Sequence, residues 1–229
     1  WLMLRAVLIG CGKIGSSFAD DPKIDGVYAH AHAYAECEGV QLVGVCDADP
    51  HTAAQCGQRW QVSVVYTDYV RMLHELQPDI VSVCTPDASH LDVLQAVLQT
   101  DSVKGILAEK PLAACLDGAE QVVSLARARD VRLAVNYSRR YALSHQKLRE
   151  QLPGRLGGIQ SVNGFYTKGL LHNGTHWLDL LRFLCGPLQL LGCYPGLSPF
   201  DGDLPGDPSP TVVLQLASGA PAILTGLDA

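Results

Sequence analysis

The stretch Gly10-Cys-Gly-Lys-Ile-Gly15 follows directly on the apolar run Ala6-Val-Leu-Ile9. Three glycines at this spacing, between an aliphatic run and a segment that can form a helix, are typical of the turn that cradles a dinucleotide pyrophosphate. The first glycine permits the tight turn, the second lets the backbone approach the pyrophosphate, and the third lets helix and strand pack closely. The anion would rest on amides at the helix N-terminus. The residues expected to hold the cofactor here are Gly10, Gly12, Lys13, Ile14 and Gly15.

An acidic residue follows the next apolar run. Asp47 comes directly after Val40–Cys46, where a carboxylate would accept hydrogen bonds from the ribose hydroxyls of an adenosine. Its charge would repel a 2′-phosphate, and neither of the next two residues is an arginine, so we expect NAD rather than NADP. Asp47 lies 32 residues after Gly15, whereas the fingerprint has about 20, and we assign the excess to an inserted loop at Asp20–His30. An ordinary strand, turn and helix with a surface aspartate is the alternative.

Residues 1–136 show a regular alternation of strand-like and helix-like segments. The strands are apolar throughout rather than at every second position, which favours a parallel sheet covered by helices on both faces. The strand-like runs are Leu4–Ile9, Val40–Cys46, Val62–Tyr66, Ile80–Cys84, Gly105–Ala108 and Arg132–Val135. The amphipathic segments between them are Ala29–Cys37, His51–Trp60, Tyr69–Leu76, His90–Gln99 and Leu116–Arg129. We therefore predict an α/β fold whose first domain, residues 1–136, is a doubly wound Rossmann sheet that binds NAD.

From residue 137 to residue 229 the pattern changes. Strands now meet through turns, which predicts an α+β domain with an open, predominantly antiparallel sheet. Its expected helices are Tyr141–Leu152 and Gly174–Leu184, and its expected strands are Ile159–Thr167, Leu188–Tyr194, Thr211–Ala217 and Pro221–Thr225. A loop dense in proline and glycine spans residues 195–210. Because this domain is thin, we expect either a shortened chain or a partner that covers the open sheet edge.

Composition narrows the class of protein. The chain is 48% apolar and carries a net charge of −6 without a basic cluster, so we expect neither nucleic acid nor an anionic membrane as a partner. No window of eighteen residues is uninterruptedly apolar, and the first nine residues run into the glycine motif without a signal-peptide cleavage site. The eight cysteines show no C-x-x-C spacing, which favours reduced thiols in a cytoplasmic protein over a disulfide framework and gives no metal motif.

Polar residues follow two of the predicted parallel strands. Glu109-Lys110-Pro111 ends one of them, and the stretch from Cys84 to His90 ends another. Ligands of open α/β sheets bind at the carboxyl ends of the strands, so a lysine there would face the cofactor crevice. Each of these two features alone is a weak indication of a site. A lysine at another place in a chain would by default be a surface residue exposed to solvent.

A third candidate lies in the second domain, at His172–Asp179. His172 and His176 are four residues apart and Asp179 is three further on, so a helix would place all three on one face. A histidine titrates near neutrality and can take a hydroxyl proton while hydride leaves the same carbon. A metal site is the competing functional interpretation, but the pair lacks the glutamate of H-E-x-x-H. Two histidines bonded to backbone carbonyls would be the structural alternative.

Taken together, these motifs resemble the Gfo/Idh/MocA oxidoreductases, named for glucose–fructose oxidoreductase and inositol dehydrogenase. The resemblance rests on the glycine cradle, Cys84-Thr-Pro with His90, Glu109-Lys-Pro111 and Gly174-Thr-His-Trp-Leu-Asp179, and covers residues 4 to about 186. It implies hydride transfer between a nicotinamide and a hydroxyl or carbonyl carbon of a sugar, cyclitol or related polar substrate. It also implies an open sheet in the second domain that is often used to form homo-oligomers.

The resemblance also implies roles for individual residues. Lys110 would orient the reacting oxygen and His176 would be the general acid/base, aided by His172. Besides the cradle and Asp47, the cofactor would be contacted by Thr85, Pro86, His90 and Glu109. The substrate pocket would be formed by Asn136, Arg140, Asn173 and Asp179.

The sequence departs from the family in two places. The family usually has an aspartate four residues before the catalytic histidine, and this chain has His172 there. The second domain of the family also continues well past residue 229. These departures keep open the alternative of a dinucleotide-binding metabolite sensor without catalysis. A separate alternative is a redox-neutral enzyme that cleaves glycosides by transient oxidation with tightly held NAD.

Overall fold

The computed structural model describes residues 3–23, 26–152, 154, 155, 157–196, 199, 200 and 206–227. The chain divides into two compact units, residues 1–136 and residues 137–229.

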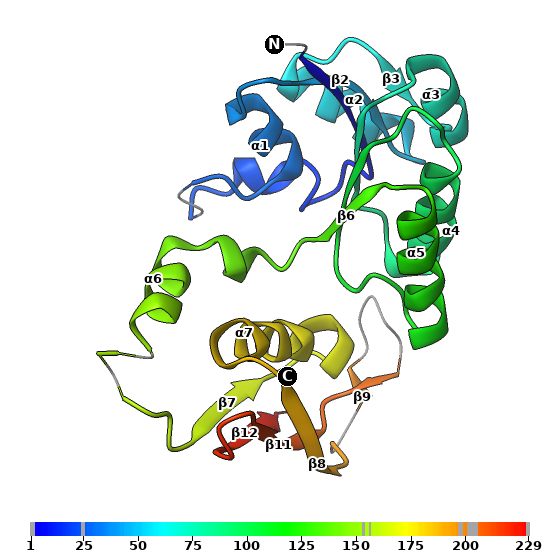
Figure 1. Ribbon diagram of the computed structural model, residues 1–229. Helices are drawn as coiled ribbons and strands as arrows, with labels where there is room; N and C mark the ends of the chain where they lie inside the picture. Colours follow the sequence, from blue (N-terminus) through cyan, green and yellow to red (C-terminus); the bar gives the residue numbers. More distant parts are fainter. Residues whose placement is uncertain are drawn as a thin grey trace. The chain divides into compact units, whose positions relative to one another are not determined.

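A six-stranded parallel sheet forms the centre of the first unit (Figure 1). Its strand order is β3-β2-β1-β4-β5-β6, and every neighbouring pair is parallel. This is the order of the doubly wound fold, in which the chain builds one half of the sheet and then returns to build the other. The predicted fold class is therefore confirmed. The strands are β1 (Leu4–Ile9), β2 (Val40–Cys46), β3 (Val65–Tyr66), β4 (Ile80–Val83), β5 (Gly105–Ala108) and β6 (Arg132–Val135).

Helices cover both faces of this sheet. Successive residues of β1 enter different cores: Val7 and Ile9 pack with α3, α4 and α5, whereas Leu8 packs with α1 and α2. This explains why the strands are apolar throughout. The helices are α1 (His30–Glu36), α2 (Pro50–Trp60), α3 (Tyr69–Leu76), α4 (Asp87–Leu98) and α5 (Leu116–Ala128). In the part of the chain that the structure describes, no helix combines the length and apolar character required to cross a membrane.

The helix after the glycine motif is interrupted by an insertion. A first turn is closed by the Ser16 N–H, which donates to the Gly12 carbonyl at 2.9 Å, and the short 3₁₀ helix η1 (Ser17–Asp20) follows. The helix then resumes at His30, whose N–H donates to the carbonyl of Ile14 at 3.0 Å. In an uninterrupted helix residue 18 would make that bond, so residues 18–29 form the insertion, which begins before the predicted Asp20 and includes two residues outside the described ranges. Without it, Asp47 would follow the motif at the usual spacing of about 20 residues.

The second unit contains a four-stranded mixed sheet of order β7-β12-β11-β8 (Figure 1). Its β7–β12 pair is parallel and the other two pairs are antiparallel, as predicted for a mostly antiparallel sheet. The strands are β7 (Val162–Tyr166), β8 (Leu188–Tyr194), β11 (Thr211–Leu216) and β12 (Pro221–Gly226). Helix α7 (Thr175–Cys185) packs on the buried face of the sheet, and α6 (Leu143–Gln151) precedes β7.

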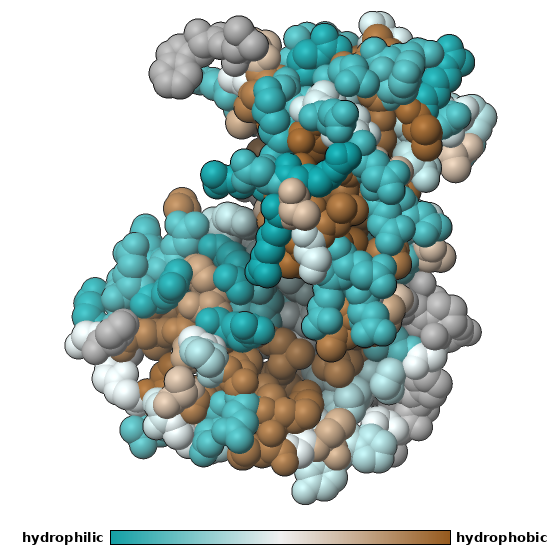
Figure 2. Space-filling model, turned by 45° about the vertical axis from the view of Figure 1, so that its right-hand side comes forward, coloured by the Kyte–Doolittle hydropathy of each residue, from teal (hydrophilic) through white to brown (hydrophobic). Residues whose placement is uncertain are grey.

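Several apolar side chains of this unit remain exposed. The surface of the second unit shows a broad group of hydrophobic residues in the lower part of Figure 2. On the strands of the sheet, the exposed ones are Phe165, Leu190, Leu191, Tyr194 and Ile223. They include edge and open-face positions, which lie outside the core formed with α7.

Two features of the second unit differ from the sequence-based prediction. The loop predicted for residues 195–210 contains two short paired strands, β9 (Pro199–Phe200) and β10 (Asp207–Pro208), and its residues 197, 198 and 201–205 lie outside the described residues. The helix predicted to begin at Gly174 begins at Thr175 and is preceded by a π-helical turn, η3 (Leu170–Gly174). A further 3₁₀ turn, η2 (Ser138–Tyr141), follows β6.

Candidate active site

The three glycines of the cradle occupy different environments. Gly10 has a φ of +94°, and a Cβ there would lie 2.5 Å from the Cys84 carbonyl carbon; a Cβ on Gly15 would meet the Gly10 carbonyl oxygen. A Cβ on Gly12, by contrast, would have no heavy atom within 4 Å. Among the described residues, none accepts a hydrogen bond from the amides of Gly12, Lys13 or Ile14. The loop therefore has an open backbone surface with free N–H groups, which suits a phosphate.

Asp47 lies beside this loop at the end of β2. Its Oδ2 accepts from the Cys11 N–H at 2.8 Å, and its Oδ1 accepts from the Asp49 N–H at 3.0 Å. Each carboxylate oxygen has a further lone pair, and the residue is half-buried. Asp47 is therefore tied to the cradle and keeps acceptor capacity for a ribose.

Two buried thiols, one of them within the glycine cradle, lie in the same hydrophobic core. Cys11 and Cys56 both belong to the core between the sheet and helices α1 and α2. The Cys11 Sγ donates to the Cys46 carbonyl at 3.5 Å. Each of the two thiols has the largest influence on the other: Cys56, together with burial, raises the pKa of Cys11 far above its usual range, and Cys11 lowers the pKa of Cys56 to about 7. Arg59 and Trp60 both donate to Ser16 Oγ at 3.0 Å, which anchors the first turn to α2. All eight cysteines of the chain are free thiols.

Glu109 at the end of β5 is buried, and both of its carboxylate oxygens form hydrogen bonds. Its Oε1 lies 2.9 Å from His30 Nε2 and accepts from Asn136 Nδ2 at 2.6 Å, while its Oε2 accepts from the Lys110 N–H at 3.3 Å. Burial alone would raise the pKa of Glu109, but the hydrogen bonds from His30 and Asn136 outweigh it, so the pKa lies below its usual value. Glu109 is therefore an ionised carboxylate next to Lys110, whose peptide bond to Pro111 is cis.

His90 is a buried residue of α4 that contacts the turn after β4. Its side chain is 1% exposed, and its Nδ1 lies 3.3 Å from the Thr85 carbonyl oxygen and 3.2 Å from Thr85 Oγ1. Burial lowers the pKa of His90, so the ring is neutral at physiological pH. Thr85 and Pro86 form the turn into α4, where Pro86 is the N-cap residue. His90 thus acts on this turn from within the core.

A carboxylate from a distant loop holds the turn that carries His172. Asp207 is 4% exposed, and its Oδ1 and Oδ2 accept from the N–H groups of Leu171 at 3.0 Å and His172 at 2.8 Å. Gly169, with a φ of +84°, packs so closely that a Cβ there would overlap Asp207 Oδ2. Asp207 therefore caps the N-terminal end of η3, where backbone N–H groups have no partner within the helix.

The remaining candidates of the second unit are also engaged. The His176 ring meets Tyr137 edge to face at a centroid distance of 5.8 Å. Asp179 accepts a bidentate pair of bonds from Arg140, through Nε at 2.7 Å and Nη2 at 2.6 Å. Asn173 Nδ2 donates to the Thr167 carbonyl at 3.1 Å. Arg140, Asn173 and Asp179 therefore hold the local structure around the two histidines.

Residues 4–137, more than half of the chain, match the family described as "Oxidoreductase family, NAD-binding Rossmann fold", Gfo/Idh/MocA. The chain belongs to this family. It is 30% identical over 203 residues to the D-glucoside 3-dehydrogenase of Escherichia coli K12, covering 82% of this chain and 54% of that protein. It is 24% identical over 238 residues to the D-apiose dehydrogenase of Paraburkholderia graminis, covering 96% and 59%. The chain thus spans little more than half the length of these curated relatives.

A solved structure extends the likeness to both units. A 3-ketoreductase from Actinomadura kijaniata, in complex with TDP-benzene and NADP, superposes with a TM-score of 0.80 at 22% identity, over 97% of this chain and 68% of that one. At this identity the match shows the shared fold. Because the family match covers residues 4–137, the first unit is the NAD(P)-binding Rossmann domain of a Gfo/Idh/MocA oxidoreductase.

The structure also shows residues near the candidate site residues that the sequence analysis did not predict as part of a site. Tyr34 bonds to Ser82, Ser82 bonds to His30, and His30 bonds to Glu109, although α1, β4 and the end of β5 are far apart in the sequence. Asp207 lies in the loop rich in proline and glycine. The one available signal was His30 itself, a histidine at the point where the interrupted helix resumes.

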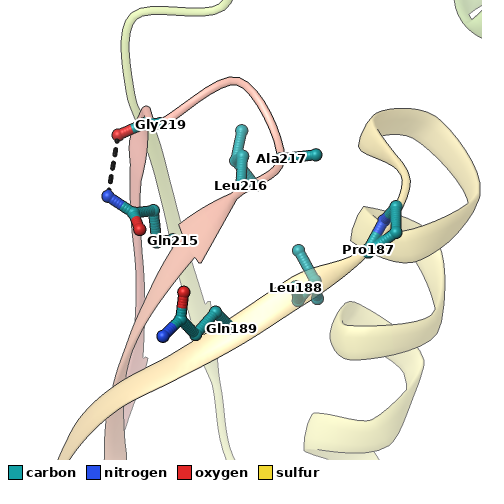
Figure 3. A pocket seen from close by; sticks show the side chains of 7 residues that line it. All are labelled: Pro187, Leu188, Gln189, Gln215, Leu216, Ala217 and Gly219. Atoms are coloured by element: carbon teal, nitrogen blue, oxygen red, sulfur yellow. Dashed lines mark hydrogen bonds between the residues drawn. The ribbon is translucent and has the colours of Figure 1, made fainter.

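One pocket of the second unit lies away from these residues. A pocket of about 290 Å³ lies between β8 and the β11–β12 hairpin (Figure 3). Figure 3 shows Gln215, which donates to the Gly219 carbonyl at 3.3 Å, together with Gln189 and apolar neighbours. None of its lining residues is titratable, so it offers no acid, base or nucleophile.

Proposed function

We propose that this chain carries the catalytic residues of an NAD-dependent oxidoreductase that acts on a CH–OH group of a sugar or cyclitol. When bound, the nicotinamide supplies the carbon that exchanges hydride. The observation that carries the proposal is the arrangement within the first unit: an open glycine cradle after β1 and Lys110 after β5, at the carboxyl ends of strands in one sheet.

Lys110 provides the positive charge for the reacting oxygen. A fixed ammonium stabilises a transition state most where negative charge develops, here on the oxygen of the alcohol that loses hydride. The ionised Glu109 and the buried His90 fix the strand ends on either side, so Lys110 is attached to a rigid base. His176 takes or returns the hydroxyl proton, aided by His172, because an imidazole changes protonation near neutral pH.

Asp47 supports NAD rather than NADP. Its half-buried carboxylate follows β2, and no arginine occupies the next two positions to neutralise a 2′-phosphate. The similar D-glucoside 3-dehydrogenase and D-apiose dehydrogenase support a sugar as the substrate class.

A metabolite sensor that binds NAD without catalysis is the second candidate. It is favoured by His172, which stands where the family has an aspartate. One observation argues against the sensor. The Asp207 carboxylate accepts hydrogen bonds from the backbone of the turn that carries His172, so a carboxylate lies close to this position, and this favours catalysis.

The test is NADH formation, read by absorbance, from NAD and a panel of glucosides, aldoses and inositols. We expect turnover with at least one member and a loss of about 100-fold or more in Lys110→Ala and in His176→Ala. Lys104→Ala, which removes an exposed lysine paired with Asp79, is the matched control and should retain activity. Tight NAD binding with no turnover of any substrate in the panel would instead favour the sensor.

A further inference from the structure

A buried chain of polar side chains crosses the first unit beneath Lys110. Tyr34 OH lies 2.8 Å from Ser82 Oγ, Ser82 Oγ lies 3.0 Å from His30 Nδ1, and His30 Nε2 lies 2.9 Å from Glu109 Oε1. Asn136 closes the chain with its bond to the same carboxylate oxygen. The members come from α1, β4, the end of β5 and the end of β6, and His30, Ser82 and Glu109 are 3%, 0% and 9% exposed.

The donors and acceptors of this chain fit one protonation pattern. Burial raises the pKa of Tyr34 to about 12, so the phenol keeps its proton and donates to Ser82. In the His30 tautomer that carries its proton on Nε2, the Ser82 hydroxyl donates to Nδ1 and the Nε2–H donates to the Glu109 carboxylate. Each of these three bonds has one donor and one acceptor.

The order Ser82, His30, Glu109 contains the residue types of a hydrolase triad. Ser82 is wholly buried, however, so no substrate can reach its hydroxyl. A nucleophilic role is therefore excluded, and the function of the chain must lie in what its far end touches.

His30 connects that far end with the cofactor cradle. Its backbone N–H donates to the Ile14 carbonyl inside the glycine motif, and its ring holds Glu109, which in turn accepts from the Lys110 N–H. One residue thus bonds both to the loop expected to bind the pyrophosphate and to the neighbour of the expected catalytic lysine.

We propose that His30 is a positioning residue that fixes Lys110 through Glu109 and sets the position of Lys110 relative to the cofactor cradle. The proposal rests on the function proposed above, because it concerns the geometry of that same lysine. A displacement of about 1 Å in a reacting group can lower a rate by about 100-fold. A buried bond to the adjacent side chain, within a network that cannot shift without breaking several contacts, restricts such movement.

Two substitutions at position 30 separate the two bonds of the ring. In His30→Gln the amide nitrogen can take the place of Nε2 and keep the bond to Glu109, while the bond to Ser82 is lost. In His30→Asn the shorter amide takes the place of Nδ1, keeps the bond to Ser82 and leaves Glu109 without its histidine donor. We expect kcat to fall about 10- to 100-fold in His30→Asn, with the KM for NAD changed much less, and to recover largely in His30→Gln.

The control for stability is Val122→Ala, which opens a cavity in the core beneath α5, away from the site. It should lower the melting temperature without the selective fall in kcat. If His30→Asn and His30→Gln lose activity equally, or only in proportion to their loss of stability, as Val122→Ala does, the positioning role is contradicted.

A second readout needs no substrate. The rate at which trinitrobenzenesulfonate modifies Lys110, followed by peptide mass spectrometry with the exposed Lys104 as internal reference, reports the mobility and surroundings of the amine. We expect a several-fold higher rate at Lys110 in His30→Asn and a nearly wild-type rate in His30→Gln. An equal rate in both variants would contradict the proposal, whereas a wild-type protein that oxidises no polyol would contradict only the proposed function.

Discussion

At the scale of single residues, the cradle glycines separate folding from binding. A side chain at Gly10 or Gly15 would collide with backbone, whereas one at Gly12 would enter open space next to free amides. Glycine is thus required at two positions by the protein itself and at the third by whatever approaches the loop.

Gly12→Ala should therefore impair NAD binding, whereas Gly15→Ala should impair stability. Gly12→Ala should leave the free energy of unfolding within about 1 kcal/mol of the wild type and weaken NAD binding about tenfold or more, because the added methyl occupies the place of the pyrophosphate. Gly15→Ala should lower the free energy of unfolding by about 1–3 kcal/mol or more. Urea unfolding and calorimetric titration with NAD measure the two quantities, and wild-type affinity in Gly12→Ala would show that the loop is not the cofactor site.

The sequence could predict the residues whose role is local and could not predict those whose role arises in the fold. The glycine spacing and Lys110 after a strand are visible in short windows of sequence. The network of His30, Ser82 and Glu109 is not, because its members are separated by at least 27 positions and meet only when α1, β4 and β5 pack. The roles expected for Glu109 and Asn136 in ligand contact stay predictions, and the structure adds that they bond to each other.

At the scale of elements, apolar periodicity gave the strands and helices of the first unit to within a few residues, since each buries a contiguous apolar segment or face. It missed β9 and β10, because two residues carry no period, and it missed η3, because that turn depends on Asp207 from 35 residues further along the chain. The insertion before α1 was visible as an excess of sequence, although its start was not.

The π turn gives a prediction of its own. Gly169 and Gly186 have similar φ values, +84° and +81°, but only Gly169 packs against a side chain, the carboxylate of Asp207. Gly186→Ala should lower the free energy of unfolding by about 1–3 kcal/mol from the backbone alone, because a φ of +81° with a ψ of −154° is a conformation that essentially only glycine adopts. Gly169→Ala should lose about 1–3 kcal/mol more, because the methyl overlaps the carboxylate. Equal losses in urea unfolding would show that Asp207 does not pack on this turn.

At the scale of the whole molecule, the chain contains a Rossmann unit of a known oxidoreductase family and a second unit with a mostly antiparallel sheet. We propose that hydride passes between a polyol carbon and NAD while Lys110 stabilises the reacting oxygen. NADH absorbance reports only net reduction, whereas an isotope at the reacting carbon reports the transfer itself.

The most direct test follows deuterium from substrate to cofactor. The chain is incubated with NAD and glucosides or inositols deuterated at their ring carbons, and the cofactor is analysed by mass spectrometry. We expect NADH that carries one deuterium from at least one substrate. Lys110→Ala should form this NADH at a rate lower by about 100-fold or more. Bound NAD that never acquires deuterium, or equal transfer by the wild type and Lys110→Ala, would contradict the proposal.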